Sequence, residues 1–433
     1  MTSILSFRVV PWQLPFLLAV GCLLSMRPLA HGSEDAAIDP VRSLREYLDR
    51  GDELAETVKE PFAALSLTAD QAKAVAEVVT RVHRDGIRET RKAEHEAKRI
   101  ELDGLTMKYG VSVFGKAPAK GHSLYLSMHG GGGAPPAVND QQWGNQQRLY
   151  QLEEGIYVAP RAPTDTWDLW HQPHIDRFFA RLIENMIALE GVDPDRIYLT
   201  GYSAGGDGVF QLAPRMADRF AAAAMMAGHP NETQPLGLRN LPFTLHMGER
   251  DAAYNRNQQA EKWKRELAAL REQDPTGYEH WVEIHTGKGH WMDRQDAAGV
   301  KWMAKFERDL APRRVVWLQD NVLQDRFYWL AVSPAVAKGG DVVEVTRDAN
   351  HFSITRSDAR ELSILLRDNI VDFDQPIVVE YRGERLHEGV ARRTIADIVS
   401  TLIDRGDPRA IFTGKVTVTL PKVEASGRSG QVK

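Results

Sequence analysis

The stretch Gly201-Tyr202-Ser203-Ala204-Gly205 decides the fold of this chain. It follows the apolar run 196–200, which predicts a strand, and it leads into residues 204–217, which have helical spacing. A serine in the pattern Gly-x-Ser-x-Gly between a strand and a helix sits on a tight turn, whose backbone strain costs about 1–3 kcal/mol. The flanking glycines are needed because side chains there would collide with the strand and the helix. We therefore predict that Ser203 is a nucleophile held at the end of a sheet.

A glycine run upstream predicts the part of the site that stabilises negative charge. Residues 122–128 predict a short strand that leads directly into the glycines 130–133. Unshielded backbone N–H groups can point at the oxyanion of a tetrahedral intermediate, where each fixed donor is worth roughly 3–4 kcal/mol. We predict that Gly131, Gly132 and Ala204, the residue after the nucleophile, form this oxyanion hole. A flexible turn is the alternative interpretation of the glycine run.

An acidic residue follows a later predicted strand. The apolar run 241–247 ends shortly before Asp251. Parallel strands share polarity, so the loop after this strand lies at the same edge of the sheet as Ser203. We predict that Asp251 is the acid of a catalytic triad, with Glu249 and Asp293 as rival candidates.

A histidine completes the pattern. One predicted helix, 255–272, and one predicted strand, 279–285, separate Asp251 from the loop that holds His290. This is the spacing that brings the next loop of the sheet beside the acid. We predict that His290 is the general base for Ser203 and that Asp251 orients its imidazole. The order serine, acid, histidine along the chain is that of α/β-hydrolases.

The region 105–311 therefore resembles the α/β-hydrolase superfamily. With the strand 109–114 ahead of the glycine run, it is similar to secreted esterases of the feruloyl esterase and polyhydroxybutyrate depolymerase type. The resemblance implies a sheet with flanking helices, and hydrolysis of carboxylic esters through an acyl-enzyme intermediate with no cofactor. Such depolymerases often carry disulfides, which the mature chain cannot form because its one cysteine, Cys22, lies in the N-terminal apolar segment. The substrate, a small or a polymer-linked ester, is left open.

Two other functions fit the same motif. A peptidase of the prolyl oligopeptidase kind shares the catalytic groups, but it carries a large propeller ahead of the hydrolase domain, which about 70 helical residues cannot build. A binding protein with an inert hydrolase fold would have no need to keep a serine, an acid and a histidine. An esterase is therefore our prediction, with these two functions as alternatives.

The loop 164–171 holds two tryptophans on the predicted catalytic edge. We expect Trp170 and His171 to line the substrate site, although a hydrophobic plug that closes the loop onto the core fits the same residues. His171 and His174 lack a third ligand at a sensible spacing, so we predict no metal site.

Composition and the N-terminus indicate an exported protein with no nucleic-acid partner. The chain has 433 residues, 43% of them hydrophobic, and a net charge of −5, which gives no electrostatic reason to bind nucleic acid. Residues 1–32 combine Arg8, an apolar core at 16–26 and small residues at 30–32, which predicts a secretory signal. We expect export to the periplasm or the medium, with no stable membrane insertion after cleavage and no lipid anchor at Cys22. An uncleaved anchor is the alternative, and the oligomeric state is left open.

The rest of the chain predicts two flanking parts. Residues 33–104 contain helices at 39–50 and 68–98 and form a helical extension packed on the hydrolase. Residues 312–423 consist of short alternating segments, with one helix at 392–404, and predict a mainly antiparallel β domain. We favour a packing or lid role for this domain over carbohydrate or polymer binding. Residues 424–433 are expected to form a disordered tail.

Overall fold

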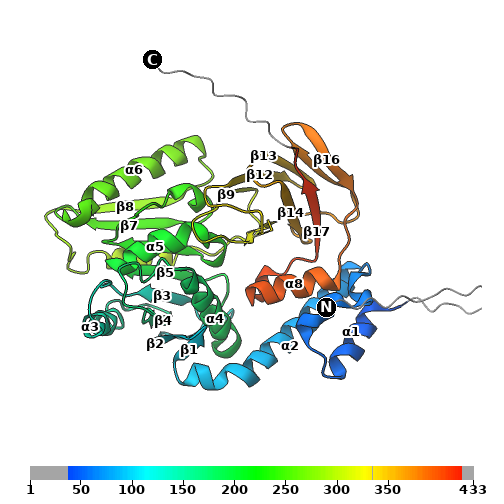
Figure 1. The fold of residues 1–433 in the computed structure, drawn as a ribbon, viewed down its shortest axis with the longest axis horizontal. Coiled ribbons are helices and arrows are strands. Elements are labelled where there is room, and N and C mark those ends of the chain that lie inside the picture. The colour runs from blue at the N-terminus through cyan, green and yellow to red at the C-terminus, as the bar shows by residue number, and fades with distance from the viewer. Residues whose placement is uncertain (1–37, 334, 422–433) are drawn as a thin grey trace, which may run out of the picture. The chain divides into compact units, whose positions relative to one another are not determined.

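The computed structural model describes residues 38–333 and 335–421 (Figure 1). The predictions for the signal segment 1–32, for Cys22 and for the tail 424–433 lie outside these residues. Contacts divide the chain into two units, Met1–Ile38 and Asp39–Lys433. All elements described below belong to the second unit.

A mixed eight-stranded sheet carries the candidate site. Its order is β1-β2-β4-β3-β5-β6-β7-β8; β1, β2 and β4 pair antiparallel, and every pair from β4 to β8 is parallel. The strands are β1 (Arg99–Leu102), β2 (Leu105–Phe114), β3 (Leu124–Met128), β4 (Gly155–Pro160), β5 (Ile197–Tyr202), β6 (Ala222–Met226), β7 (Phe243–Gly248) and β8 (His280–His285).

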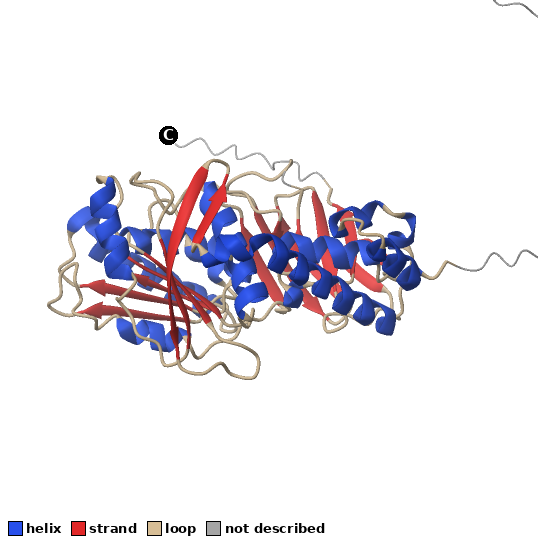
Figure 2. Ribbon diagram, turned by 90° about the horizontal axis from the view of Figure 1, so that it is seen from below, coloured by secondary structure: helices blue, strands red, loops and turns tan. Residues whose placement is uncertain are grey.

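Helices cover both faces of this sheet, and Figure 2 shows them packed along its strands. Successive side chains of a strand point to opposite faces, so Leu124 and Leu126 of β3 enter one hydrophobic cluster and Tyr125 enters another. Two-sided burial explains why the central strands are continuous apolar runs. The helices are α3 (Pro136–Gln146), α4 (Pro173–Glu190), α5 (Ala204–Arg215), α6 (Arg256–Gln273) and α7 (Ala297–Met303).

The N-terminal extension contains α1 (Pro40–Asp49) and the long helix α2 (Ala69–Glu96). A capping box begins α2, because the Thr68 side chain accepts from the Gln71 N–H and the Gln71 side chain accepts from the Thr68 N–H. The helix packs on the hydrolase through Glu184 of α4, which pairs with His83 and Arg91.

The C-terminal region contains two smaller sheets and helix α8 (Ile395–Arg405). The prediction of a mainly antiparallel region is confirmed, although β13 and β15 pair in parallel. One sheet has the order β16-β15-β13-β12-β9 and the other β10-β11-β14-β17. Their strands are β9 (Arg314–Leu318), β10 (Arg326–Phe327), β11 (Leu330–Ala331), β12 (Val342–Asp348), β13 (His351–Ser357), β14 (Glu361–Leu366), β15 (Ile377–Tyr381), β16 (Glu384–Gly389) and β17 (Gly414–Thr419).

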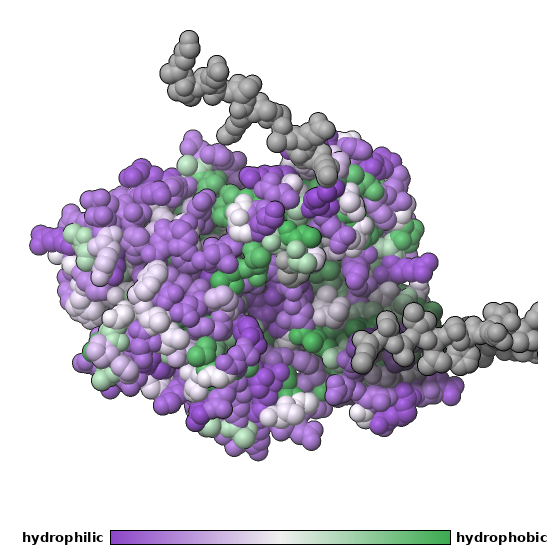
Figure 3. Space-filling model, in the orientation of Figure 1, coloured by the Kyte–Doolittle hydropathy of each residue, from purple (hydrophilic) through white to green (hydrophobic). Residues whose placement is uncertain are grey.

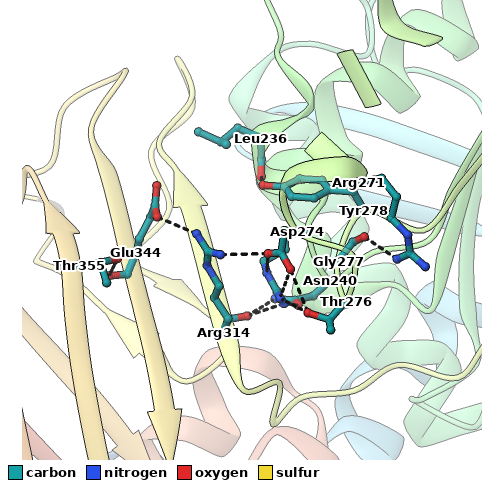
Figure 4. A network of polar contacts seen from close by, with 11 residues as sticks. Leu236, Asn240, Arg271, Asp274, Thr276, Gly277, Tyr278, Arg314, Glu344 and Thr355 are labelled. Carbon is teal, nitrogen blue, oxygen red and sulfur yellow. Dashed lines mark hydrogen bonds and ion pairs between the residues drawn. The ribbon is translucent and has the colours of Figure 1, made fainter. Parts of the chain in front are cut away.

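Residues on the two sides of each predicted boundary of the hydrolase region are in contact. Strand β1 lies within the predicted extension but pairs with β2 of the large sheet. At the other boundary, Arg314 of β9 contacts Asp274, which follows α6, at 3.2 Å and Glu344 of β12 at 3.1 Å. Asp274 also accepts two hydrogen bonds from Arg239. Figure 4 shows Arg314 between Asp274 and Glu344. Partial burial acts to raise the pKa of Asp274, but hydrogen bonds from Arg239 and Thr276 and the two guanidinium charges lower it.

The helices of the described residues differ from membrane-spanning helices. None of the helices there combines the length and the apolar composition that a membrane span requires. The face drawn in Figure 3 is mostly hydrophilic, with hydrophobic side chains gathered in small patches.

A buried ion pair fixes the C-terminal region to the large sheet. The Arg308 side chain is 2% exposed, and its guanidinium contacts Asp407 at 2.7 Å and Asp195 at 3.0 Å. Burial alone would raise the pKa of Asp407, but the charge and hydrogen bond of Arg308 lower it below its usual value. Loss of the guanidinium would leave the Asp407 charge buried without its partner.

We expect Arg308→Ala to lower the free energy of unfolding by about 3–5 kcal/mol in urea denaturation. The matched control is Arg42→Ala, which removes an exposed ion pair to Glu46 within α1. That change should cost no more than about 0.5 kcal/mol. Equal effects of the two variants would contradict the structural importance of the Arg308 pair.

Candidate active site

The turn at Ser203 has the strained geometry that its sequence predicts. Ser203 lies between β5 and α5 with φ 58° and ψ −121°. A Cβ on Gly201 would lie 2.2 Å from the Gly205 carbonyl oxygen, and one on Gly205 would lie 2.1 Å from the Met128 carbonyl oxygen. Both distances are far inside van der Waals contact, so only glycine fits. The Ser203 N–H is held by the Met226 carbonyl oxygen at 2.9 Å.

The structure brings together Ser203, His290 and Asp251, from the loops after β5, β8 and β7. His290 Nε2 lies 2.9 Å from Ser203 Oγ, and His290 Nδ1 lies 2.7 Å from Asp251 Oδ2. An ionised carboxylate only accepts hydrogen bonds, so Nδ1 carries the proton and Nε2 is free to accept from the serine hydroxyl. The Asp251 side chain is 2% exposed and that of His290 is 44% exposed.

The two rival acids make other contacts. Glu249 accepts a hydrogen bond from the Gly287 N–H at 2.6 Å, which fixes the start of the histidine loop. Asp293 pairs with Lys288 at 2.8 Å. Neither carboxylate has a hydrogen bond to His290 among the contacts of the described residues.

The glycine loop lies beside the serine. Gly131 has φ 108° and lines the cavity at Ser203. The Gly132 N–H departs from its predicted role, because it donates to Asn139 Oδ1 at 2.8 Å. Ala204 is the first residue of α5, so its N–H has no partner within the helix. Gly131 and Ala204 therefore remain as the candidate pair of oxyanion donors.

Two side chains that the sequence analysis did not single out hold this loop. The Ala162 N–H donates to His129 Nε2 at 3.1 Å, so Nδ1 carries the proton and donates to the Gly130 carbonyl oxygen at 2.6 Å. Burial lowers the pKa of His129 to about 4, which keeps the imidazole neutral. Asn139 is fully buried and also donates to Asp165 at 2.8 Å. The position of His129 just before the glycines could have indicated from the sequence that it holds this loop. No local sequence pattern indicates the same for Asn139.

Trp170 and His171, which we predicted to line the substrate site, are not among the residues that line the cavity at Ser203. Trp170 is fully buried, and its indole N–H donates to the His129 carbonyl oxygen at 2.9 Å. Its ring also lies against Gly208 of α5, where an added Cβ would approach the Trp170 Cβ to 2.6 Å. His171 is buried as well. The alternative of a hydrophobic plug describes this loop, and Trp167 is its exposed tryptophan.

The cavity at Ser203 has a volume of about 620 Å³ and no acidic lining residue. One wall is aromatic, formed by Tyr202 and Trp291, and two arginines, Arg148 and Arg294, add positive charge. Trp291 and Arg294 follow His290 so closely that the sequence could have indicated their place in the cavity. No sequence pattern indicates that Arg148 lines it. The remaining lining residues are apolar or uncharged: Gly130, Gly131, Val138, Gln142, Asn145, Gln146 and Leu149.

No cluster of three or more His, Cys, Asp or Glu side chains within residues 38–333 and 335–421 is arranged to hold a metal ion.

The plug assignment predicts a stability difference between two neighbouring tryptophans. Trp170→Ala should lower the free energy of unfolding by about 3–5 kcal/mol, because it empties a buried site. Trp167→Ala should stay within about 0.5 kcal/mol of the wild type, because that ring faces solvent. Urea denaturation of both variants measures the difference. A Trp170→Ala protein as stable as the Trp167→Ala protein would rule out the plug.

Comparisons with known proteins point to one fold. Residues 150–309 match the dienelactone hydrolase family. The putative esterase NocK of Nocardia uniformis subsp. tsuyamanensis is 32% identical over 195 residues, which cover 42% of this chain and 55% of that protein, so the chain spans about half of its relative's length. A feruloyl esterase module from Clostridium thermocellum, complexed with sinapinate, is 14% identical with a TM-score of 0.36, over 48% of this chain and 86% of that one. An S-formylglutathione hydrolase from Agrobacterium tumefaciens is 14% identical with a TM-score of 0.38, over 48% of this chain and 93% of that one. The parallel strands, their flanking helices and the family match confirm that this chain has the α/β-hydrolase fold and resembles the serine esterases of that superfamily.

Proposed function

We propose that this protein is a serine esterase that hydrolyses carboxylic esters through an acyl-enzyme intermediate. The observation that carries the proposal is the continuous contact from Ser203 Oγ through the His290 ring to Asp251, with distances of 2.9 and 2.7 Å. The match to the dienelactone hydrolase family and the similarity to a putative esterase support the same chemistry.

In the proposed reaction Ser203 Oγ attacks the acyl carbon while His290 Nε2 takes the hydroxyl proton. The resulting imidazolium is stabilised by the buried Asp251 carboxylate. The N–H groups of Gly131 and Ala204 bind the oxyanion of the tetrahedral intermediate. Collapse of this intermediate expels the alcohol, which receives the proton from His290. Water then attacks the acyl-enzyme in a second step with the same proton transfers and releases the acid.

The lining of the cavity favours esters with a second, anionic group. Arg148 and Arg294 have no acidic partner within 4.0 Å in the described chain, and no carboxylate lines the cavity. The nearest acid in sequence to Arg294 is Asp293, which pairs with Lys288. An acyl group with its own carboxylate could pair with either guanidinium and place its apolar part against Trp291.

We also propose that the protein is exported, on the basis of the signal predicted at residues 1–32. Expression of the full chain in a bacterium and N-terminal sequencing of the secreted or periplasmic fraction tests this. A product that begins at Met1 in the cytoplasmic fraction would contradict export.

Replacement of the proposed nucleophile tests the function directly. We expect Ser203→Ala to lower kcat by roughly 10⁶-fold, and His290→Ala to do the same, because the two groups act as one unit. Asp251→Ala should be milder, at roughly 10⁴-fold. The matched control is Asp293→Ala, which removes the rival acid in the loop of His290. This variant should keep most of the activity. Hydrolysis of acetyl, butyryl, feruloyl and hydroxybutyrate esters is the measurement.

Ser203→Ala activity within tenfold of the wild type on any of these esters would contradict the proposal. The two alternatives give different results. A prolyl-oligopeptidase-like peptidase would cleave proline-containing peptides faster than the esters. An inert binding protein would not react with a fluorophosphonate probe, which labels an activated serine.

The charge of the cavity gives a second test. The wild type should hydrolyse the mono-4-nitrophenyl ester of succinic acid with a higher kcat/KM than 4-nitrophenyl butyrate, which lacks the carboxylate. Arg294→Ala and Arg148→Ala should each lower kcat/KM for the succinate ester by about tenfold, the scale of one charged hydrogen bond. Activity on the butyrate should change little, and added salt should reduce the preference for succinate. The same loss on both esters would contradict anion recognition.

A further inference from the structure

Tyr202 connects the two loops that carry the proposed nucleophile and base. It is the residue before Ser203, at the end of β5. Its hydroxyl donates to the His290 carbonyl oxygen at 2.7 Å and accepts from the Met292 N–H at 3.2 Å. One phenol therefore holds the backbone on both sides of the segment from His290 to Trp291.

Apart from the hydrogen bonds of the His290 ring to Asp251 and Ser203, few contacts hold this segment. In the part of the chain that the structure describes, the two bonds to Tyr202 are the only hydrogen bonds between the backbone of residues 289–292 and another element. The neighbouring attachments end earlier in the loop, at Gly287 and Lys288. Packing does not replace them, because the side chains of His290 and Trp291 are about half exposed. The buried Met292 side chain anchors one end only.

The ring of Tyr202 supports the same segment. It meets the His290 ring edge-on with centroids 5.9 Å apart, and the Trp291 ring with centroids 5.8 Å apart. Tyr202 itself is 8% exposed. Burial raises the pKa of its phenol well above the usual value, so the hydroxyl keeps the proton that it donates.

We propose that Tyr202 is a positioning residue that keeps His290 Nε2 within hydrogen-bonding reach of Ser203 Oγ. This inference rests on the proposed esterase function. Because Tyr202 and Ser203 are consecutive, the strained turn that aims the hydroxyl also sets the place of the base. The variable second position of the Gly-x-Ser-x-Gly pattern would then take part in positioning the catalytic histidine in this chain.

The geometry explains why the effect should be on the chemical step. The ring of Tyr202 lines the cavity and is kept in a change to phenylalanine, whereas its hydroxyl is bonded to the backbone of the histidine loop. Displacement of a catalytic group by about 1 Å can cost about 100-fold in rate. Loss of the hydroxyl should therefore lower kcat while substrate binding changes little.

The test is Tyr202→Phe, which keeps the ring and removes the hydroxyl. The matched control is Tyr198→Phe, on the same face of β5, where a buried phenol donates to the Phe306 carbonyl oxygen at 2.9 Å, away from the histidine loop. We expect Tyr202→Phe to lower kcat by about 10- to 100-fold with KM within about threefold of the wild type. The rate of fluorophosphonate labelling should fall in parallel. Tyr198→Phe should change neither quantity.

Hydrogen exchange gives a readout that does not depend on catalysis. The Met292 amide donates to the Tyr202 hydroxyl, so its exchange should become faster in Tyr202→Phe. The Ser203 amide, held by the Met226 carbonyl oxygen, should keep its protection. A general loss of protection in Tyr202→Phe would mean that the hydroxyl supports the whole fold, and this outcome would overturn the proposal.

The positioning role is also overturned if kcat of Tyr202→Phe stays within about twofold of the wild type, or if Tyr198→Phe loses as much activity. Failure of the esterase proposal would look different. In that case the wild type itself would hydrolyse no ester and react with no fluorophosphonate, whereas the exchange experiment would still report on the Tyr202 contacts.

Discussion

The strained turn at Ser203 is the constraint on which the site depends. Its positive φ places the hydroxyl beyond the end of β5, and the close approach of β5, α5 and β3 there leaves room only for hydrogen at Gly201 and Gly205. Such strain persists only where surrounding contacts hold it. One of these contacts is the hydrogen bond from the Ser203 N–H to the Met226 carbonyl oxygen. Another is the packing of the Trp170 side chain against Gly208 of α5.

Hydrogen bonds from buried side chains fix the loops around this turn. A neutral His129 bridges Gly130 and Ala162, and Asn139 ties the glycine loop to Asp165. Donors fixed in advance need no reorganisation when charge develops, which is the main way in which enzymes stabilise an oxyanion. Asp251 is buried, whereas His290 is about half exposed beside the cavity. The proposed acid is thereby kept from water, and the proposed base remains open to the cavity.

Local patterns predicted much of the fold and singled out three side chains that the structure brings within hydrogen-bonding distance of one another. The strand before Ser203, the capping box at Thr68 and the order of Ser203, Asp251 and His290 are all visible in short stretches of sequence. Contacts between distant segments could not be predicted from such short stretches. Burial of Trp170 depends on a carbonyl acceptor at residue 129, and the parallel pairing of β13 with β15 leaves no distinct pattern in alternating strands. The bonds of the Tyr202 hydroxyl also depend on a loop almost ninety residues away.

Helix α2 packs against both α4 and α8, and the contact with α8 has a consequence for synthesis. Val75 and Val79 of α2 share a hydrophobic cluster with Ile398 and Leu402 of α8, near the other end of the described chain. On the ribosome, the apolar stripe of α2 therefore emerges long before its partner does. Until α8 is made, that stripe is open to chaperones or to other nascent chains. A chain that ends before α8 would leave the apolar side chains of α2 exposed and prone to aggregation, although Ser203, Asp251 and His290 would all be present.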